Sequence, residues 1–296
     1  MKYRLISLPI ILLSHIPLRI MYVISDCIFY LLYYVIRYRR EITRKNLVGS
    51  FPEKSEKEIK QIEKKFYRFF TDNIVESCRM ISISKEEISR RIKFTNIDTI
   101  NDILRSGKSI SLYIGHYGNW EWVSSMPLHI DKCAVATQIY QKLRNKNMSR
   151  LIMYSRERMG AKSVEMRKTA RYVHETISNN IVSIVGYIAD QSPRKKDVSH
   201  FIPFLNRQAP VLVGTEKITK HYKLEAWFLK VSRVKRGYYE AEFIQLHENP
   251  SELPDFKLTE MYYNKLEQII KEVPELYLWT HNRFKHALEL DKPLSE

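Results

Sequence analysis

The sequence predicts an α/β domain with a central mixed sheet flanked by helices, preceded by a membrane-associated helical segment at the amino terminus. Two short apolar runs with strand character, residues 109–115 and 181–189, lead directly into polar residues. Residues 225–234 and 238–246 alternate as the two strands of a hairpin around Lys235-Arg236-Gly237. Strands interleaved with helices indicate an α/β domain that binds ligands near the carboxyl ends of its strands.

The composition fits a folded protein of 296 residues, with 44% hydrophobic and 12% aromatic side chains. A chain of this kind can bury a sizeable core, which excludes disordered and fibrous classes. The three cysteines, Cys27, Cys78 and Cys133, are too few and too scattered for a disulfide scaffold or a structural zinc site. We therefore expect no bound metal and a reducing compartment.

The amino-terminal segment is the most apolar part of the chain. Residues 20–36 hold 17 residues with one charge, and a helix of that length would measure about 25 Å, at the short edge of a membrane span. A tilted span, a re-entrant hairpin, an interfacial helix and a buried helical pair all fit. The basic flank Arg37-Tyr38-Arg39-Arg40 favours membrane association, with the rest of the chain on the cytoplasmic face. We therefore divide the chain into an anchoring segment, residues 1–40, and a domain, residues 41–296.

Helix signals follow in order. Ser55 to Glu58 forms a capping box, and the apolar residues after it share one helical face: Ile59, Ile62, Phe66, Phe69 and Phe70. A second capping box, Ser84 to Glu87, opens another helix. The basic stretch 142–171 is expected to be largely helical, and residues 258–271 form a helix that ends near Pro274.

The charge is strongly positive and unevenly distributed. The formal net charge is +16, and residues 142–171 alone contribute ten basic and two acidic side chains. An excess of this size indicates an anionic partner. Nucleic acid, an anionic bilayer, a phosphorylated lipid and an acidic carrier protein all fit.

The strongest chemical signal is His116-Tyr117-Gly118-Asn119-Trp120-Glu121, directly after the first strand. A histidine at a strand end reaches into a crevice, and a carboxylate five residues later could hold one ring nitrogen and leave the other as a base. The alternative is a capping histidine and a solvated glutamate.

Several segments together carry a family resemblance. The hexapeptide resembles the histidine-x4-acid motif of glycerolipid-type acyltransferases, in the form used by the late acyltransferases of bacterial lipid A biosynthesis. Further matches follow the family's order: Tyr38-Arg39-Arg40, Asn46-Leu47 and Phe51-Pro52 before the motif, then Arg156-Glu157-Arg158, Asp190-Gln191, Phe201 to Phe204 with Gly214, and Pro274 to Lys285. The resemblance spans nearly the whole chain.

The resemblance implies a membrane enzyme that moves a fatty acyl chain from a thioester to a hydroxyl of a lipid A precursor. The donor would be acyl carrier protein or coenzyme A as a co-substrate, with no bound cofactor, at the cytoplasmic face of a bacterial inner membrane. We predict that His116 is the general base and that Glu121 orients its ring. Arg158 or Arg156, with backbone amides after the strand, are the candidate oxyanion donors.

The resemblance also implies a set of substrate-binding residues. Asp190 and Gln191 follow a second strand that could end beside the first, so they would shape the site or bind the acceptor; a helix cap or a turn is the alternative. His281 and Arg283 would contact a phosphate or close the domain, whereas Trp279 and Phe284 are expected in the core. We also expect Asn119 and Trp120, within the motif, to contact substrate.

Two rival functions remain open at this point. The enzyme could acylate a lysophospholipid or an aminolipid. From a different class, the chain could be a non-catalytic, membrane-tethered binder of anionic lipid or nucleic acid. No helix-turn-helix, zinc finger or aromatic RNA-binding motif is found, and a binding module has no use for a strand-end histidine paired with an acid, so we expect no nucleic-acid partner.

Overall fold

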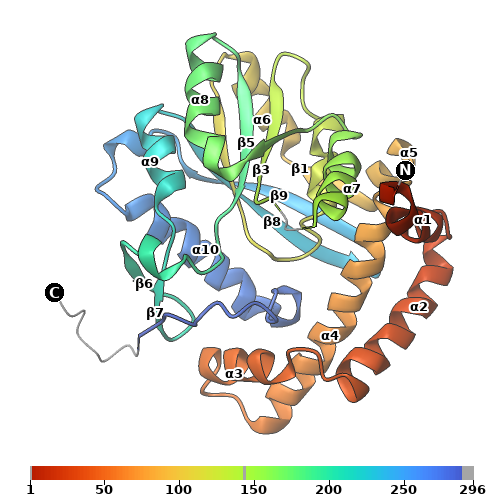
Figure 1. Ribbon diagram of the computed structural model, residues 1–296. Helices are drawn as coiled ribbons and strands as arrows, with labels where there is room; N and C mark the ends of the chain where they lie inside the picture. Colours follow the sequence, from red (N-terminus) through yellow and green to blue (C-terminus); the bar gives the residue numbers. More distant parts are fainter. Residues whose placement is uncertain (1, 143–144, 289–296) are drawn as a thin grey trace.

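A mixed seven-stranded sheet forms the centre of the molecule in the computed structural model, which describes residues 2–142 and 145–288. The strand order is β1-β9-β8-β2-β5-β3-β4, and neighbouring strands are parallel except in the β8–β9 hairpin. A separate antiparallel pair, β6–β7, lies at one side (Figure 1). The strands are β1 (Ile92–Thr95), β2 (Ile110–Ile114), β3 (Val135–Tyr140), β4 (Lys162–Glu165), β5 (Ser183–Ile188), β6 (Phe201–Pro203), β7 (Gln208–Pro210), β8 (Glu225–Lys235) and β9 (Tyr238–His247).

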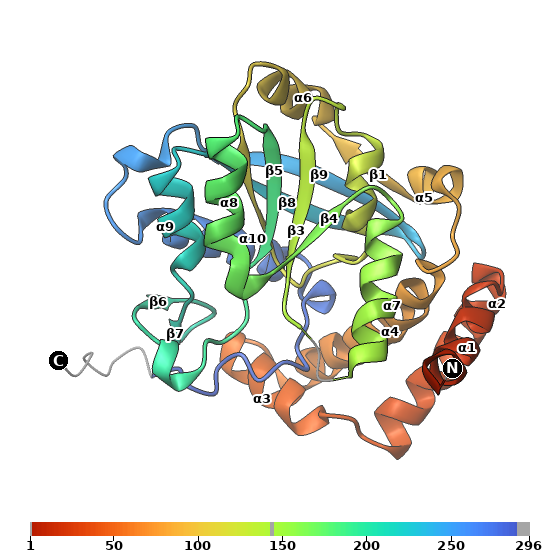
Figure 2. The ribbon, with the colours of Figure 1, turned by 45° about the horizontal axis from the view of Figure 1, so that its top comes forward.

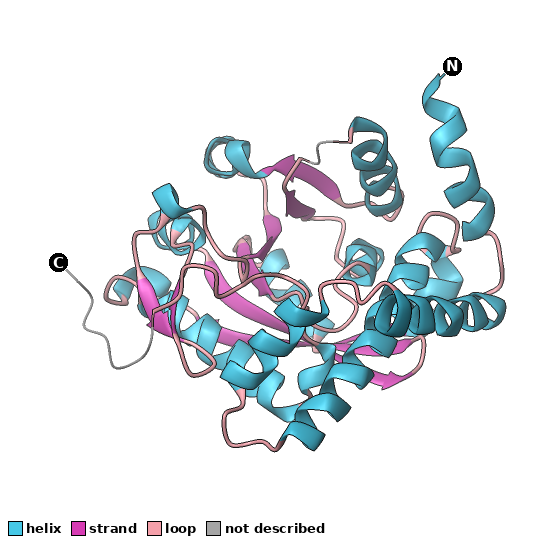
Figure 3. Ribbon diagram, turned by 60° about the horizontal axis from the view of Figure 1, so that its bottom comes forward, coloured by secondary structure: helices cyan, strands magenta, loops and turns pink. Residues whose placement is uncertain are grey.

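Helices cover both faces of this sheet (Figure 3). The α-helices are α1 (Lys2–Ser14), α2 (Leu18–Tyr30), α3 (Arg40–Ser50), α4 (Glu56–Arg79), α5 (Lys85–Arg91), α6 (Ile97–Arg105), α7 (Lys146–Glu157), α8 (Thr169–Ser178), α9 (Gly214–His221) and α10 (Lys257–Glu272). A π-helical turn η1 (Leu31–Val35) continues α2, and the short 3-10 turns are η2 (Trp122–Leu128), η3 (Met166–Lys168), η4 (Lys195–Asp197), η5 (Pro250–Glu252) and η6 (Pro274–Leu276). The predicted α/β class, with its mixed sheet and apolar amino-terminal helix, is confirmed.

The two apolar runs are the central strands. Every residue of β2 is buried, and five of the six residues of β5 are, because helices cover both faces of the sheet there. Both strands and the β8–β9 hairpin lie where the sequence predicted them. The capping box of Ser55 and Glu58 is present at the start of α4, and Ser84 caps α5.

Three short strands of the main sheet were not predicted. β1, β3 and β4 carry polar residues such as Lys93, Gln138 and Lys162, so they lack a continuous apolar signal. The basic stretch is consequently only partly helical, because β4 and η3 separate α7 from α8. Arg144, within that stretch, lies outside the described residues, as do residues 289–296.

The amino-terminal helices lie along one side of the molecule, opposite α9 and β6–β7 (Figures 1 and 2). α2 lies alongside α4, and its residues Leu18, Met21 and Phe29 belong to the same hydrophobic core as α4 and the sheet. Residues Leu18–Val35 are long and apolar enough to cross a membrane, yet 28% of this window is buried against the protein. The division at residue 40 stays a prediction.

Candidate active site

Two strand ends bring an imidazole and a carboxylate together. β2 and β5 are adjacent parallel strands, and Ile114 pairs with Ile188 in their register. His116 and Asp190 each follow two residues later, so both side chains leave the sheet at its carboxyl edge. Asp190 Oδ1 lies 2.6 Å from His116 Nδ1, and the backbone N–H of His116 donates to Asp190 Oδ2 at 3.1 Å. One carboxylate therefore holds both the ring and the backbone of His116.

The predicted contact between Glu121 and His116 is wrong. Glu121 instead accepts two hydrogen bonds from Arg156 of α7, at 3.0 Å from Nε and 2.7 Å from Nη2. Residues 115–121 form an irregular loop rather than a helical turn, so the carboxylate does not fold back onto the ring. The bidentate pair with the guanidinium engages both carboxylate oxygens. The orienting group of His116 is Asp190.

The charge of Asp190 decides which ring nitrogen of His116 is free. Burial raises the pKa of Asp190, but attraction to His116 and hydrogen bonds from its ring and backbone lower it more, so the net pKa lies below its ordinary value. An ionised carboxylate only accepts, so Nδ1 carries the proton and Nε2 keeps its lone pair. The amide nitrogen of Gln191 lies 3.2 Å from this Nε2. Gln191 thus lies on the side of the ring that carries the free lone pair.

A second histidine closes the same edge of the site. His281 Nε2 accepts a hydrogen bond at 3.3 Å from the backbone N–H of Ser192, in the loop after Asp190. Burial lowers the pKa of His281 to about 4, so this ring is neutral at physiological pH. The neutral ring supports the loop that carries Asp190 and Gln191; its predicted contact with substrate stays a prediction.

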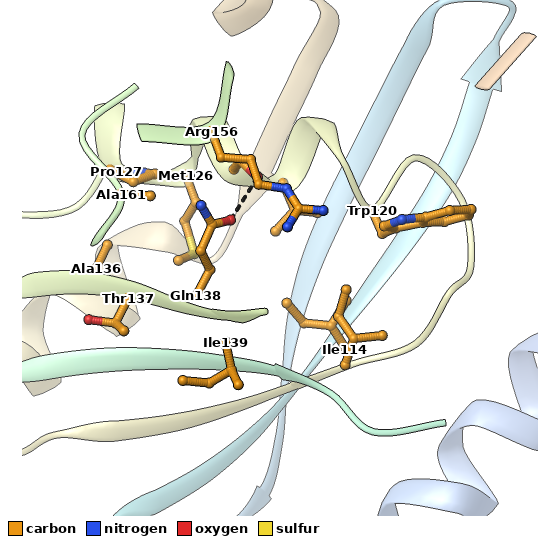
Figure 4. Close-up of a pocket in the computed structure, with 14 residues that line it drawn as sticks. Ile114, Trp120, Met126, Pro127, Ala136, Thr137, Gln138, Ile139, Arg156 and Ala161 are labelled. Carbon is orange, nitrogen blue, oxygen red and sulfur yellow. Dashed lines mark hydrogen bonds between the residues drawn. The ribbon is translucent and has the colours of Figure 1, made fainter. Parts of the chain in front are cut away.

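A narrow apolar pocket begins beside His116. The ring of Trp120 contacts the His116 ring edge to face, with centroids 5.3 Å apart, and Trp120 also lines the pocket. Figure 4 shows Ile114 and Trp120 at one end of the pocket and side chains of β3 along its wall. The Arg156 guanidinium points toward the end that holds Trp120. The lining residues are Ile114, Trp120, Val123, Ser124, Met126, Pro127, Ala136, Thr137, Gln138, Ile139, Arg156, Ala161, Gly186 and Ile188.

The polar side chains of this pocket are occupied by one another or by their neighbours. Ser124 donates to Gln138, and Gln138 donates to Ser163, at 3.0 and 3.1 Å. Thr137 pairs with Tyr172 at 2.8 Å. With these groups satisfied, the surface left for a ligand is mainly hydrocarbon, with one cation, Arg156, near its end.

Three of the predicted site residues make structural contacts, which for Arg283 is one of the two roles that the sequence left open. Arg158 donates through Nη1 to the backbone carbonyls of Met80 and Ile83 at 3.2 and 2.7 Å, so it ties the end of α7 to the segment after α4. Its predicted role as an oxyanion donor stays a prediction. Asn119 is 1% exposed, and its amide donates at 2.6 Å to a buried carboxylate on α4, so it does not face substrate. Arg283 is also 1% exposed and donates to a backbone carbonyl and a tyrosine hydroxyl, which closes the domain.

No motif in the sequence points to the group that holds Asn119. It is Glu76 of α4, fully buried, which also accepts hydrogen bonds from Tyr22 and Tyr239 at 2.8 and 2.7 Å. A glutamate in an amphipathic helix ordinarily faces water. Its role depends on donors from three separate elements, which no local spacing reveals. Asp190, by contrast, had a usable signal, since it follows its strand by the same two residues as His116.

No three histidine, cysteine, aspartate or glutamate side chains come together as metal ligands would among residues 2–142 and 145–288. The polar groups that the described residues bring to the site are those of His116, Asp190, Gln191 and the Glu121–Arg156 pair.

Nearly the whole chain matches a family of known proteins. A family model described as bacterial lipid A biosynthesis acyltransferase matches residues 3–286. The chain belongs to this family. A lipid A biosynthesis acyltransferase from Haemophilus influenzae is 23% identical over 273 residues, which cover 91% of this chain and 83% of that protein. The resemblance carried by the motifs is confirmed, and membership of the lipid A acyltransferase family supports an acyltransferase that acts on lipid A.

In this member of the family, the carboxy-terminal segment that resembles the closing signature, residues 274–285, packs directly on the site. The backbone N–H of Leu278 donates to the carbonyl of His116 at 3.1 Å, and that of Gly118 donates to the carbonyl of Leu276 at 3.0 Å. Trp279 is fully buried, as predicted, and Phe284 is partly buried against the core. Backbone hydrogen bonds from this segment therefore hold the loop that carries His116 in place.

Proposed function

We propose that the protein transfers a fatty acyl chain from an acyl thioester to a hydroxyl of a lipid A precursor, with His116 as general base. The observation that supports this most strongly is the His116–Asp190 pair at the carboxyl edge of the sheet, beside an apolar pocket. Family membership supports the acyl transfer to lipid A. We add to this a thioester donor, a hydroxyl acceptor and the roles of the individual residues.

The reaction proceeds without a covalent enzyme intermediate. His116 Nε2 takes the proton of the acceptor hydroxyl, which replaces Gln191 in front of the ring, and the oxygen attacks the thioester carbonyl. The new C–O bond gives a tetrahedral oxyanion; the C–S bond then breaks, and the imidazolium returns the proton to the departing thiolate. Asp190 stabilises the imidazolium in between, at 2.6 Å from Nδ1.

Arg156 is the candidate for stabilising the oxyanion. A guanidinium has five N–H donors, and two of its nitrogens are held by Glu121, which fixes the orientation of the rest. Arg156 also lines the pocket, so its remaining donors lie near the place that the thioester carbonyl would occupy. In this mechanism Glu121 acts by holding Arg156.

The apolar pocket is proposed to hold the acyl chain of the donor. Its walls come from β2, β3, β5 and η2, and its end at Ile114 and Trp120 adjoins His116. A chain lying there places its thioester next to the base. The depth of the pocket would then select the chain length.

The basic residues of α7 and the segment after it suit an acidic donor. Lys146, Arg150 and Lys162 are exposed, and the first two belong to α7, the helix that carries Arg156. Acyl carrier protein is acidic, so its docking on α7 would be steered by charge and would bring the thioester to the pocket. Coenzyme A carries phosphates and is the alternative donor.

The outer face of α2 suits attachment to the surface of a bilayer. Large apolar side chains along this helix and η1 face outward: Ile20, Val23, Tyr30, Leu31, Tyr34 and Val35. The helix also makes polar contacts with the domain that a membrane span would break, since the buried Ser25 donates to Asp72 at 2.7 Å and Arg236 donates to Asp26 at 2.8 Å. We therefore infer that α2 lies in the interface rather than crossing the membrane.

The test is mass spectrometry of lipid products after incubating purified enzyme with matched acyl donors and a panel of acceptors. Transfer of one acyl chain from acyl carrier protein thioester to a lipid A precursor is the expected result. Transfer only to a lysophospholipid or an aminolipid would keep the chemistry and overturn the acceptor. No transfer from either donor to any lipid would overturn the proposal.

A further inference from the structure

A fully buried carboxylate on α4 joins the amino-terminal helix to the catalytic loop. Glu76 is 0% exposed, and its Oε2 accepts from Asn119 at 2.6 Å and from the Tyr239 hydroxyl at 2.7 Å. Its Oε1 accepts from the Tyr22 hydroxyl of α2 at 2.8 Å. Burial raises the pKa of this carboxyl to about 7, against the lowering effect of hydrogen bonds from Tyr239 and Tyr22. The position of a carboxylate buried in this way depends on each of its hydrogen-bond donors, because the loss of one leaves a buried oxygen unpaired.

The loop that Glu76 holds is residues 116–122, which we call the catalytic loop because it runs from His116 past Trp120 to Glu121. Besides Asn119, the backbone carbonyl of Glu76 accepts at 3.0 Å from the indole N–H of Trp122. Asn119 in turn accepts from the backbone N–H of Trp122 at 3.0 Å. Both residues that flank Trp120 and Glu121 are thereby attached to one residue of α4.

The catalytic loop is packed so tightly that moving it would break a hydrogen bond or cause a steric clash. Asn73 of α4 donates to the carbonyl of Gly118 at 3.2 Å. Gly118 has a φ of +62°, and a Cβ there would meet the carbonyl oxygen of Val231 at 2.3 Å. Small displacements of α4 relative to the sheet are therefore transmitted to the loop rather than absorbed by it.

α2 is attached to α4 at two carboxylates one helical turn apart, and only one of them contacts the catalytic loop. Tyr22 bonds Glu76, whereas Ser25 bonds Asp72 at 2.7 Å. Asp72 is held from its other side by Arg233 and Arg236 of the β8–β9 hairpin. In each contact a hydroxyl of α2 donates to a carboxylate of α4 that is at most 2% exposed, so removal of either hydroxyl can be compared with removal of the other.

We propose that Glu76 is a positioning residue for the catalytic loop. Its hydrogen bond from Tyr22 makes the geometry of this loop depend on the position of α2 against α4. The proposal rests on the proposed acyl transfer, since the loop carries its base. Without the Tyr22 hydroxyl, Oε1 is left buried and unpaired, and the carboxylate turns or draws in water. Asn119 and Trp122 then lose their fixed acceptors, and Trp120 and Glu121 shift with them.

The first test compares Tyr22→Phe with Ser25→Ala in acyl transfer by the full-length protein. Each removes one hydroxyl from the α2–α4 contact. Tyr22→Phe should lower kcat about tenfold, because small misplacements of catalytic groups have effects of that order. Its KM should change less than its kcat, since every residue that lines the pocket is retained. Ser25→Ala should keep the wild-type kcat. Equal losses in both variants, or none in Tyr22→Phe, would overturn the proposal.

Substitutions at Glu76 itself separate positioning from folding. Glu76→Gln keeps an acceptor for Asn119, so it should retain more of kcat than Glu76→Ala when both are measured at a temperature where each is folded by circular dichroism. A Gln variant as inactive as the Ala variant would contradict the role given to the hydrogen bonds of this side chain.

The second test does not depend on activity. Of the four tryptophans, Trp122, Trp227 and Trp279 are at most 6% exposed, whereas Trp120 is partly exposed. Quenching of fluorescence by acrylamide in detergent therefore reports chiefly on Trp120 in the catalytic loop. Tyr22→Phe should raise the quenching constant and Ser25→Ala should not. If wild type transfers no acyl chain but this difference is seen, the proposed function fails and the coupling stands; if wild type transfers and quenching is unchanged, the coupling fails.

Discussion

Replacing Asp190 with asparagine tests the arrangement of the site most sharply. Asparagine keeps the shape of the side chain and can still accept from the backbone N–H of His116, which Asp190 Oδ2 accepts at 3.1 Å. It removes the negative charge that lies 2.6 Å from His116 Nδ1. The imidazolium formed during transfer would then lose its counter-charge.

The expected loss follows from that one contact. A hydrogen bond to a charged group contributes about 1.5 to 3 kcal/mol, which corresponds to about 10- to 160-fold in kcat. If the amide nitrogen turns toward Nδ1, the proton moves to Nε2 and the base is lost, and the decrease approaches the roughly 10⁴-fold seen when a triad aspartate becomes asparagine. We therefore expect kcat to fall by about 10-fold to about 10⁴-fold, with little change in KM.

The assay is steady-state acyl transfer with kcat and KM determined separately. Asp255→Asn is the matched control, because the Asp255 side chain is 85% exposed and its partner is Lys220 at the surface. It should behave as wild type. An Asp190→Asn enzyme that is folded and keeps a wild-type kcat would refute the assignment of Asp190 as the partner of His116.

Four further outcomes are expected. Arg158→Ala should lower the melting temperature, because two backbone carbonyls lose their donor at a cost of about 1 to 3 kcal/mol. It should leave kcat unchanged. A large loss of kcat at unchanged stability would show that Arg158 takes part in catalysis. Gly186→Ala adds a methyl with ordinary contacts in the pocket, so competition between donors should shift toward shorter chains. The pKa of His281 is lowered by burial to about 4, below its unfolded value, so stability should fall as pH drops from about 6.5 to about 4; thermal unfolding of His281→Gln should show a smaller loss. Val23→Asp, 63% exposed on α2, should reduce the membrane-bound fraction in flotation, whereas Ile181→Asp, 44% exposed elsewhere, should not.

The sequence was informative where the signal was local and apolar. β2 and β5 are continuous hydrophobic runs, and the polar residues after them mark the carboxyl edge of the sheet, so His116 and Asp190 were both selected. The capping boxes located the starts of α4 and α5. β1, β3 and β4 escaped prediction because they are four to six residues long and partly polar.

The pairing of the site residues lay beyond local spacing. Glu121 is five residues from His116 and was chosen as its partner for that reason, whereas Asp190 is 74 residues away along the chain. The register of β2 against β5 decides the contact, and a single sequence does not reveal register between distant parallel strands. Glu76 was even harder to predict, because a carboxylate on a helix is ordinarily solvated. Its three hydrogen-bond donors come from distant parts of the chain.

The most direct test of the proposed reaction is the mass of the lipid product formed by wild type and by His116→Ala under single-turnover conditions. Wild type should add one acyl chain to the lipid A precursor, and intact-protein spectra should show no acylated enzyme at any time. His116→Ala, folded as wild type, should form at least about 10²-fold less product in the same interval, the range over which general-base catalysis contributes. A folded His116→Ala enzyme that transfers at the wild-type rate, or an acyl-enzyme that forms before the product, would contradict the proposed mechanism.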